Sequence, residues 1–165
     1  MHRALLLALL PLAACASAET TPAAPAFEAI AFDINTWGRP MGSWEVHADG
    51  TVSHRKVEGS VFDAHKVEHR EFTVDAVAYA KLAAIAAALP QPRLKRDDCV
   101  ERAMDLPYGK VRLTRGGTEE AVDFDIGCRD RPYQAFVGQL RAMDDLVGGW
   151  AEQHPATSVE EVGGN

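Results

Sequence analysis

The chain of 165 residues has no apolar segment long enough to cross a membrane as a helix, and it has no excess of basic residues. Its most apolar run covers residues 4–12, whereas a membrane-spanning helix needs about 20 residues. The 17 Lys and Arg residues are outnumbered by 24 Asp and Glu residues, so the formal net charge is −7. Nucleic acid and anionic lipid surfaces bind basic proteins. We therefore expect no nucleic-acid partner and no adsorption to lipid through a basic patch.

The sequence also lacks the short motifs that position common catalytic groups and cofactors. It contains no G-x-S-x-G nucleophile elbow, no glycine-rich phosphate loop and no dinucleotide-binding fingerprint. Function has to be argued from such sites and not from the fold, so nothing here indicates a particular reaction. We expect a non-enzymatic protein that needs no cofactor.

The first residues do contain the pattern of a secretory signal. A positive start at residues 1–3 is followed by the apolar run and then by small residues. Leu12-Ala13-Ala14-Cys15 resembles the bacterial lipobox, in which the cysteine becomes the lipid-bearing first residue of the mature chain. Ala16-Ser17-Ala18 instead suits an ordinary signal peptidase, which would release a soluble periplasmic protein that starts at Glu19. We favour lipidation of Cys15.

Lipid on Cys15 predicts a protein that is anchored to a membrane and faces the periplasm. Residue 16 is alanine and not the aspartate of an inner-membrane retention signal, so we expect the outer membrane rather than the inner. The residues after Cys15 have two prolines and no large apolar side chain, which is typical of a flexible tether. The predicted organisation is a signal peptide (1–14), lipidated Cys15 with a tether (15–26), a single domain (27–152) and a disordered tail (153–165).

Cysteine is scarce, with three residues in the chain. If Cys15 takes the lipid, Cys99 and Cys128 remain as an even pair, and an oxidising compartment favours a disulfide between them. Such a bridge would stabilise the fold by about 3–4 kcal/mol on the loop-entropy model. The alternatives are two free buried thiols or two metal ligands.

Alternating apolar and polar residues predict strands in the first half of the domain. One strand is expected near 28–36. Residues 61–72 match neither the helical nor the strand period cleanly, and we interpret them as a strand. Residues 43–47 and 51–57 flank Ala48-Asp49-Gly50, which predicts a hairpin with a three-residue loop and a left-handed Gly50. The register that follows contains two cross-strand pairs, Val46 with Val52 and Trp44 with His54.

A helix is predicted after each group of strands. Residues 75–89 form the first, with Thr73 or Asp75 as its N-cap. The second begins at Asp130 and ends at Gly148-Gly149. The expected buried stripes are Ala78, Leu82, Ile85 and Leu89 in the first helix and Phe136, Leu140, Met143 and Val147 in the second.

A second hairpin is predicted between the two helices. Its strands, 110–114 and 120–126, flank Arg115-Gly116-Gly117. The predicted fold class is α+β: an antiparallel sheet built from two hairpin-containing halves, each followed by a helix packed on one face of the sheet.

The most specific candidate for chemistry is the segment from His65 to His69 (HKVEH), which matches the H-x-x-E-H pattern of the inverzincin metallopeptidases. That chemistry needs a helix, because helical i,i+4 spacing brings both imidazoles to one ion. In a strand, which we expect here, the two histidines lie about 13 Å apart. A metal-dependent hydrolase or metal-binding protein that uses His65, Glu68 and His69 is therefore the alternative hypothesis. His47 and His54 are expected on opposite faces of the first hairpin.

The acidic pairs carry a less specific signal. Asp123 and Asp125 alternate with apolar residues, so we expect both on the solvent face of their strand. Three further pairs are expected in loops or on an outer helix face: Asp97-Asp98, Glu119-Glu120 and Asp144-Asp145.

Several short segments together resemble an uncharacterised family of small bacterial exported domains, many of them lipoproteins. The segments are Cys99, residues 104–109 (MDLPYG), residues 125–128 (DIGC), a final helix that closes on Trp150, and the early turn at residues 49–52 (DGTV). The resemblance covers roughly residues 27–152. It implies an α+β fold and a disulfide, and it assigns no activity and no catalytic residues.

These patterns lead to one functional expectation. We expect a cell-envelope lipoprotein whose domain is a non-enzymatic binding or inhibitory module, with an envelope protein or the cell wall as its partner. The membrane is contacted through the N-terminal lipid.

Overall fold

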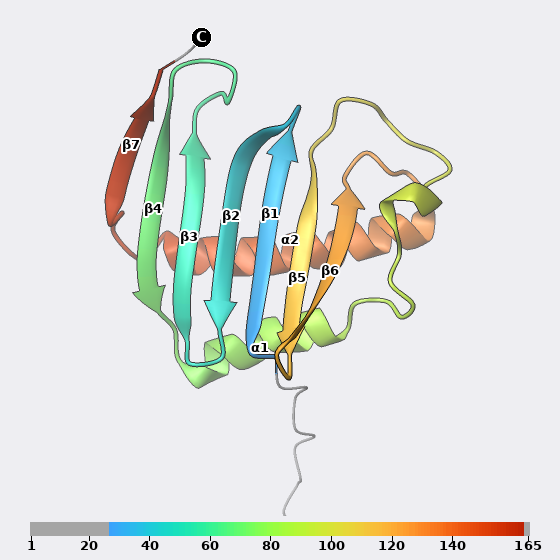
Figure 1. Cartoon of the computed structure of the whole chain (residues 1–165), viewed down its shortest axis with the longest axis horizontal. Coiled ribbons are helices and arrows are strands. Elements are labelled where there is room, and N and C mark those ends of the chain that lie inside the picture. The colour runs from blue at the N-terminus through green and yellow to red at the C-terminus, as the bar shows by residue number, and fades with distance from the viewer. Residues whose placement is uncertain (1–26, 164–165) are drawn as a thin grey trace, which may run out of the picture.

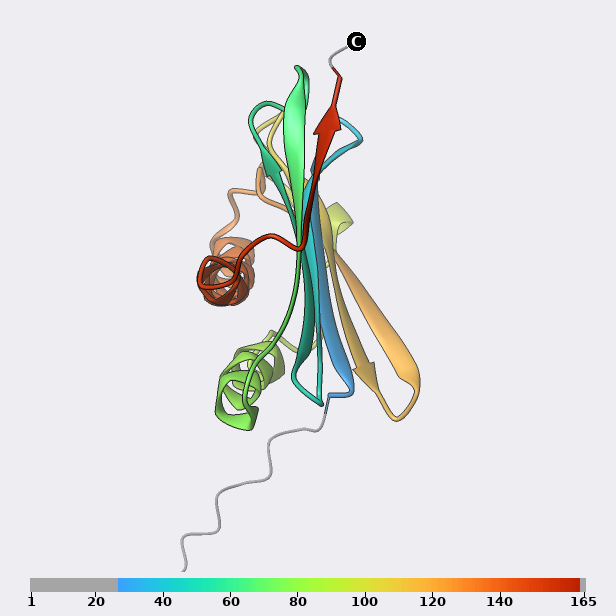
Figure 2. The same cartoon turned by 90° about the vertical axis from the view of Figure 1, so that its left-hand side faces the viewer.

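The fold is a seven-stranded antiparallel sheet with two helices on one of its faces (Figures 1 and 2). A computed structural model describes residues 27–163 of the chain. The strand order is β6-β5-β1-β2-β3-β4-β7, so the second hairpin joins the first strand and not the fourth. This confirms the predicted α+β class, with a helix after each group of strands. Among the described residues, no helix is both long and apolar enough to cross a membrane.

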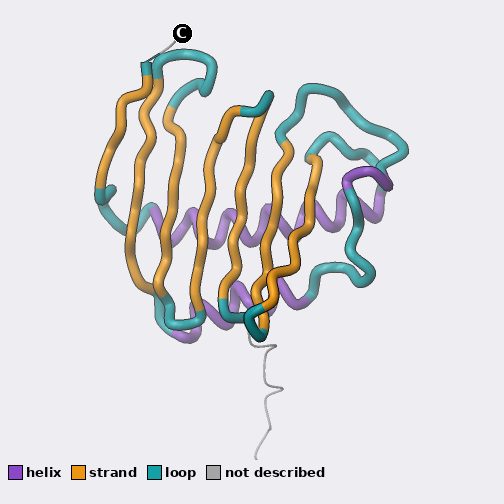
Figure 3. The backbone as a smooth tube through the Cα atoms, viewed as in Figure 1, coloured by secondary structure: helices purple, strands orange, loops and turns teal. Residues whose placement is uncertain are grey.

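The helices and strands follow the chain in an order that places both helices after strands. The elements are β1 (Ala29–Thr36), β2 (Arg39–His47), β3 (Thr51–Glu58), β4 (His65–Thr73), α1 (Ala76–Ala87), the 3₁₀ helix η1 (Arg96–Asp98), β5 (Tyr108–Arg115), β6 (Thr118–Asp125), α2 (Arg131–Ala151) and β7 (Ser158–Val162). Figure 3 shows the long connection from α1 to β5, which carries η1 and lies beside β6.

The predicted register of the first hairpin is confirmed. Val46 pairs with Val52 and Trp44 pairs with His54 across β2 and β3. Gly50 has a φ of +88°, and a Cβ at this position would clash with the carbonyl oxygen of Val74. Only glycine meets both conditions without strain.

The core lies between the sheet and the two helices. Phe32 stacks on Trp44 and on Phe124 at centroid distances of 5.5 and 5.2 Å, which ties β1, β2 and β6 together on the helix-covered face. Fully burying a side chain of this size contributes about 1.5–3 kcal/mol. The predicted stripe of the second helix is confirmed, since all four of its members are buried: Phe136, Leu140, Met143 and Val147.

The first helix differs in detail from its prediction. Asp75, and not Thr73, is the N-cap, because its carboxylate accepts a hydrogen bond from the Ala78 N–H at 2.8 Å. Within the helix the fully buried residues are Leu82, Ala83 and Ala86. These three residues belong to the hydrophobic core.

Two predicted boundaries in the second half are wrong. The second hairpin turns on Gly116-Gly117 alone, because Arg115 pairs with Thr118, and both glycines have positive φ, which suits a two-residue loop. Gly148-Gly149 does not end α2, which continues to Ala151. Ala151 is buried, and packing of this last turn outweighs the cost of about 1 kcal/mol per helical glycine.

The predicted disorder of residues 153–165 is wrong for most of its length. Ser158–Val162 forms β7, which pairs antiparallel with β4 from His65↔Val162 to His69↔Ser158. Two contacts hold the segment before β7 against β4. The Thr157 N–H donates to the His69 carbonyl at 2.7 Å, and the His154 ring stacks on Phe72 at 4.3 Å. Pairing of an otherwise open edge gives this polar segment its order.

Candidate functional site

The H-x-x-E-H segment lies on a strand, so it does not form the helical metal centre of the alternative hypothesis. Because side chains alternate along β4, His65 and His69 point to one face of the sheet and Glu68 points to the other. Glu68 is occupied there by Arg70, at 2.6 Å between Oε2 and Nη2. The two histidines are also four strand positions apart, or about 13 Å. The three residues are not brought together.

His47 and His54 lie on opposite faces of the hairpin, as predicted. His54 faces the helices, where its Nδ1 is buried without a hydrogen-bond partner among the described residues. Burial, together with Arg70 and Lys56 nearby, holds the pKa of the His54 imidazole below its usual value. The imidazole is therefore neutral at neutral pH.

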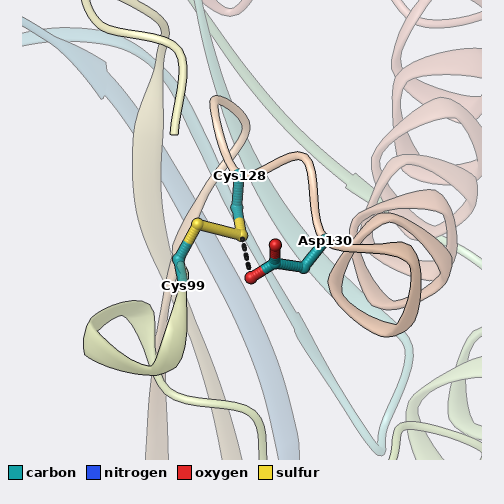
Figure 4. A group of neighbouring side chains, drawn as sticks. All are labelled: Cys99, Cys128 and Asp130. Carbon is teal, nitrogen blue, oxygen red and sulfur yellow. Dashed lines mark hydrogen bonds between the residues drawn. A yellow bond between two sulfur atoms is a disulfide. The ribbon is translucent and has the colours of Figure 1, made fainter. Parts of the chain in front are cut away.

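Cys99 and Cys128 lie at disulfide distance, with their Cα atoms 5.8 Å apart (Figure 4). Asp130 Oδ2 lies 3.7 Å from Cys128 Sγ, but Asp130 also accepts hydrogen bonds from the backbone N–H groups of Val100 and Glu101, at 2.8 and 3.3 Å. In this arrangement the three side chains anchor the loop, because the cysteine pair joins Cys99 to the end of β6 and Asp130 holds the backbone of Val100 and Glu101. Cys15, the predicted lipid site, is outside the described residues.

Asp125 is the main correction to the sequence analysis, since it is not on a solvated face. Its exposed fraction is 5%, and its Oδ2 lies 3.4 Å from Arg96 Nε and 3.3 Å from Arg102 Nε. Its Oδ1 accepts the Gly127 N–H at 2.8 Å. Asp123, by contrast, is exposed as predicted. Both arginines come from the connection before β5. This loop folds back over the end of β6, near the Cys99–Cys128 pair, and covers Asp125.

A pocket of about 290 Å³ opens directly over this ion pair cluster. It lies at the end of the sheet where the β1–β2 turn, the loop before β5 and the end of β6 meet. Its lining residues are Trp37, Arg96, Arg102, Ala103, Met104, Asp105, Leu106, Tyr108 and Asp125. The volume suits a small group such as one side chain or a carboxylate with its neighbouring atoms.

The formal charges of the pocket lining balance, but the guanidinium donors are not all used. Two guanidinium groups and two carboxylates, those of Asp105 and Asp125, line the pocket. Asp125 is the carboxylate that pairs with both arginines, and the side chains of Arg96 and Arg102 remain 43% and 31% exposed. Each guanidinium has five N–H donors. Arg102 Nη2 donates one hydrogen bond to the Arg96 carbonyl at 2.6 Å. Most of the remaining donors are available to an anion in the pocket.

Backbone strain is concentrated at the same place. Among the described residues, the two non-glycine residues with positive φ are Trp37 (49°) and Asp105 (67°), and both line this pocket. A left-handed conformation costs an L-residue about 1–2 kcal/mol, and Trp lacks the local hydrogen bonds that make Asn and Asp tolerable there. Residues held in strained conformations cluster at functional sites.

The strained turn is held next to the arginines by Tyr108. The Gly38 N–H donates to the Tyr108 hydroxyl at 2.9 Å, and the Arg96 guanidinium lies 5.0 Å from the centre of the Tyr108 ring. This arrangement keeps Trp37 at the rim with 66% of its surface exposed, and Met104 at the rim is 75% exposed. Large apolar side chains exposed beside a charged pocket are typical of binding sites.

Of the other acidic residues that were predicted to be exposed, all but Asp144 are exposed in the structure. Asp97, Asp98, Glu119, Glu120 and Asp145 are exposed as predicted. Asp144, however, is half-buried and accepts the Trp44 indole N–H at 2.9 Å, and burial raises the pKa of its carboxyl.

A second cavity, of about 440 Å³, lies beside Asp144 between the sheet and α2. Its two basic residues already have partners, since Lys56 pairs with Glu58 at 2.7 Å and Arg70 pairs with Glu68. The loop pocket is therefore the stronger candidate for a ligand site.

Sequence reasoning missed the loop pocket because its members come from four separate segments. Arg96 and Arg102 lie in an irregular connection whose path the sequence does not indicate. The alternation of β6 placed Asp125 on the solvent face of the sheet, and this connection covers that face at Asp125. One signal was available: a Trp-Gly pair at positions 37–38 between two strand patterns is an unusual two-residue turn, since Asn-Gly is the common choice.

A scan against models of known protein families, a comparison with curated proteins and a comparison with solved structures each gave no match to this chain. The family resemblance therefore remains a prediction, and the function is argued from the pocket alone.

Proposed function

We propose that this protein is a cell-envelope lipoprotein whose domain is a non-enzymatic binding or inhibitory module, with the loop pocket as its ligand site. The lipid on Cys15 would hold it at the membrane, facing the periplasm, and residues 16–26 would let the domain reach an envelope protein or the cell wall. The disulfide-distance pair of Cys99 and Cys128 suits the oxidising compartment that this location implies.

One observation carries the proposal: the strained residues, the exposed apolar side chains and the surplus guanidinium donors occur together in one small pocket. Each of these features costs stability when no ligand is bound. Natural proteins retain such costs at functional sites. The lining residues include no serine, cysteine or histidine, the side chains that most often act as nucleophile or general base, which favours binding over catalysis.

The metal-dependent hydrolase that would use His65, Glu68 and His69 receives no support from the geometry. The strand separates the two histidines and turns Glu68 away from them. Equilibration of the purified protein with zinc, followed by measurement of bound metal in the wild type and in His65→Ala, tests this alternative. We expect no stoichiometric ion in either protein.

Photo-cross-linking in living cells tests the proposed function. A photoreactive phenylalanine analogue is placed at Trp37, and at Phe62 as a control, since Phe62 is an exposed aromatic residue outside the pocket. We expect a discrete adduct from position 37 that is lost when Arg96→Gln is added, and no such adduct from position 62. Equal labelling from both positions, or no adduct from position 37, would contradict the proposal.

A further inference from the structure

The loop pocket shares one lining residue, Arg96, with a groove along the edge of β6. The groove has a volume of about 650 Å³ and lies between β6 and the connection that precedes η1. Residues 93–97 form one wall and residues 120–123 form the other. The walls are joined at one point, where Arg93 pairs with Glu120 at 2.8 and 3.0 Å. Arg96 lines both the groove and the pocket. A ligand that lies in the groove therefore meets the arginine pair at the end of β6.

The backbone of β6 can pair with such a ligand. The Ile126 N–H donates to the Pro107 carbonyl at 3.0 Å, whereas the Asp125 N–H turns away from β5 and donates to the Tyr133 hydroxyl at 3.0 Å. Because an antiparallel ladder alternates, Ala121 and Asp123 also direct their N–H and C=O groups away from β5. No described residue bonds to the N–H of either residue.

The donors at the end of the groove select the ligand group. Arg96 and Arg102 share the Asp125 carboxylate, and the Asp105 carboxylate, which also lines the pocket, balances the remaining formal charge. A ligand carboxylate is planar and accepts parallel N–H bonds, as the unused donors of the guanidinium fork require. The apolar rim formed by Trp37, Met104 and Leu106 lies beside this position and suits an apolar group next to the carboxylate.

We propose that the occupant of this site is the free carboxyl terminus of an extended polypeptide with an apolar last residue. The peptide adds to the open edge of β6, a known mode of peptide recognition. Its carboxylate bonds to Arg96 and Arg102, and its last side chain lies against the rim. Since the carboxylate lies at the end of β6, the peptide runs parallel to that strand. This inference rests on the proposed function and specifies its ligand.

Peptide binding to the exported protein purified from cells tests the inference. The probe is a pool of fluorescein-labelled hexapeptides of random sequence that end in Leu, Val or Phe with a free carboxylate. The control is the same pool with amidated ends. We expect the free-acid pool to bind at least tenfold more tightly, because hydrogen bonds to charged groups are the strongest that the site can offer. This comparison uses the unchanged protein, so it does not depend on how any variant folds.

Two variants with matched controls separate the parts of the site. Arg96→Gln should weaken binding of the free-acid pool about tenfold, whereas Arg112→Gln, which removes an arginine paired with Asp33 on the uncovered sheet face, should not. Ala121→Pro removes an outward N–H and leaves the bonds to β5 intact, so it should weaken peptide binding about fivefold, and Ala121→Val should not.

Each other outcome overturns a stated part of the inference. Equal affinity for the acid and amide pools, both reduced by Trp37→Asn, would exclude a carboxylate ligand and leave the pocket as a binding site. Competition by N-acetyl-leucine as strong as that of the peptides would exclude the strand-edge contact and indicate a free amphipathic acid. Binding of neither pool would overturn the inference as a whole, while the cross-link at position 37 decides the proposed function independently.

Discussion

At the scale of single residues, the molecule carries several local costs, and they differ in kind. Trp37 and Asp105 have a strained backbone, and Asp144 has a partly buried carboxyl. His54 has a buried nitrogen without a hydrogen-bond partner among the described residues. Each of these features destabilises the folded state. Such costs are small individually, but each is a measurable fraction of a total stability of about 5–15 kcal/mol. Substitutions that remove one cost at a time therefore give distinct signatures.

Trp37→Asn should raise stability while it removes function. Asn adopts the left-handed conformation at lower cost, so we expect the free energy of unfolding to rise by about 1 kcal/mol in urea titrations. The same variant loses the exposed indole at the pocket rim, and ligand binding should fall at least fivefold. Phe62→Asn is the control and should leave ligand binding unchanged. A variant that is less stable than the wild type would show that the turn is not strained.

Asp144→Asn should stabilise the protein at neutral pH. Burial raises the pKa of the Asp144 carboxyl, so the folded state binds more protons than the unfolded state. Stability should then fall as the pH rises from the ordinary Asp pKa of about 4 through the raised value. The amide keeps an acceptor for Trp44, which leaves removal of the charge as the main change.

Urea unfolding at pH 7 and at pH 3.5 measures this effect. We expect the Asp144→Asn variant to exceed the wild type in stability at pH 7 and to match it at pH 3.5. The exposed neighbour supplies the control, and Asp145→Asn should change stability by less than about 0.5 kcal/mol at either pH. A stability difference that does not depend on pH would contradict this account.

At the scale of elements, the sheet depends on two segments that lie outside the regular hairpins. The disulfide-distance pair ties the loop that carries both arginines to the end of β6, and β7 covers the edge of β4. Each segment can be removed without cutting a hairpin, so their contributions can be measured separately.

Replacement of both Cys99 and Cys128 by alanine should loosen the pocket. On the loop-entropy model, loss of a bridge across 29 positions lowers the free energy of unfolding by about 3–4 kcal/mol. We also expect the free-acid peptides to bind less tightly, because a bridge at this position would fix the segment between Arg96 and Arg102. Thermal unfolding and peptide titration measure the two effects. Unchanged peptide affinity in a folded double variant would show that the loop holds its shape without the bridge.

Truncation before Thr157 should expose the edge of β4. We expect a loss of about 1–2 kcal/mol in stability and the onset of association at higher concentration, because an open strand edge pairs with other chains. Chemical unfolding and sedimentation velocity measure these effects, and removal of residues 164–165 alone is the control. A truncated protein that stays monomeric and fully stable would mean that β7 contributes nothing to the sheet.

The parts of the fold that could be predicted from the sequence are those that are stabilised by residues close to one another in the chain. The β2–β3 register was predictable, because Gly50 and the apolar positions of Val46 and Val52 fix it locally. The strand β7 was not predictable, because its two glutamates are ordered only by pairing with β4. Asp125 was misplaced for a similar reason: its burial depends on arginines that approach from a different part of the chain.

At the scale of the whole molecule, one helix-covered face and one open edge determine where a partner can bind. The two helices and the core occupy one face of the sheet (Figure 2), and β7 closes one edge. The pocket and groove lie at the opposite edge, at the end of β6. With the proposed lipid on Cys15, the domain would be able to present this edge to a partner while the lipid remained in the membrane.

The intact mass of the protein recovered from its native envelope tests the tether. We expect a chain that begins at Cys15 and carries a diacylglyceryl adduct, recovered in the membrane fraction. A chain that begins at Glu19 without lipid would contradict anchoring and support a soluble periplasmic protein.

Two-dimensional NMR of the arginine side chains, recorded while the free-acid peptide pool is added, tests the central claim most directly. The claim is that a ligand is held by the pocket at the end of β6. We predict that the Nε–H signals of Arg96 and Arg102 shift together and saturate, while the signal of Arg112 on the uncovered face stays in place. Saturable shifts at Arg112 with none at Arg96 and Arg102 would place the ligand elsewhere and contradict the account.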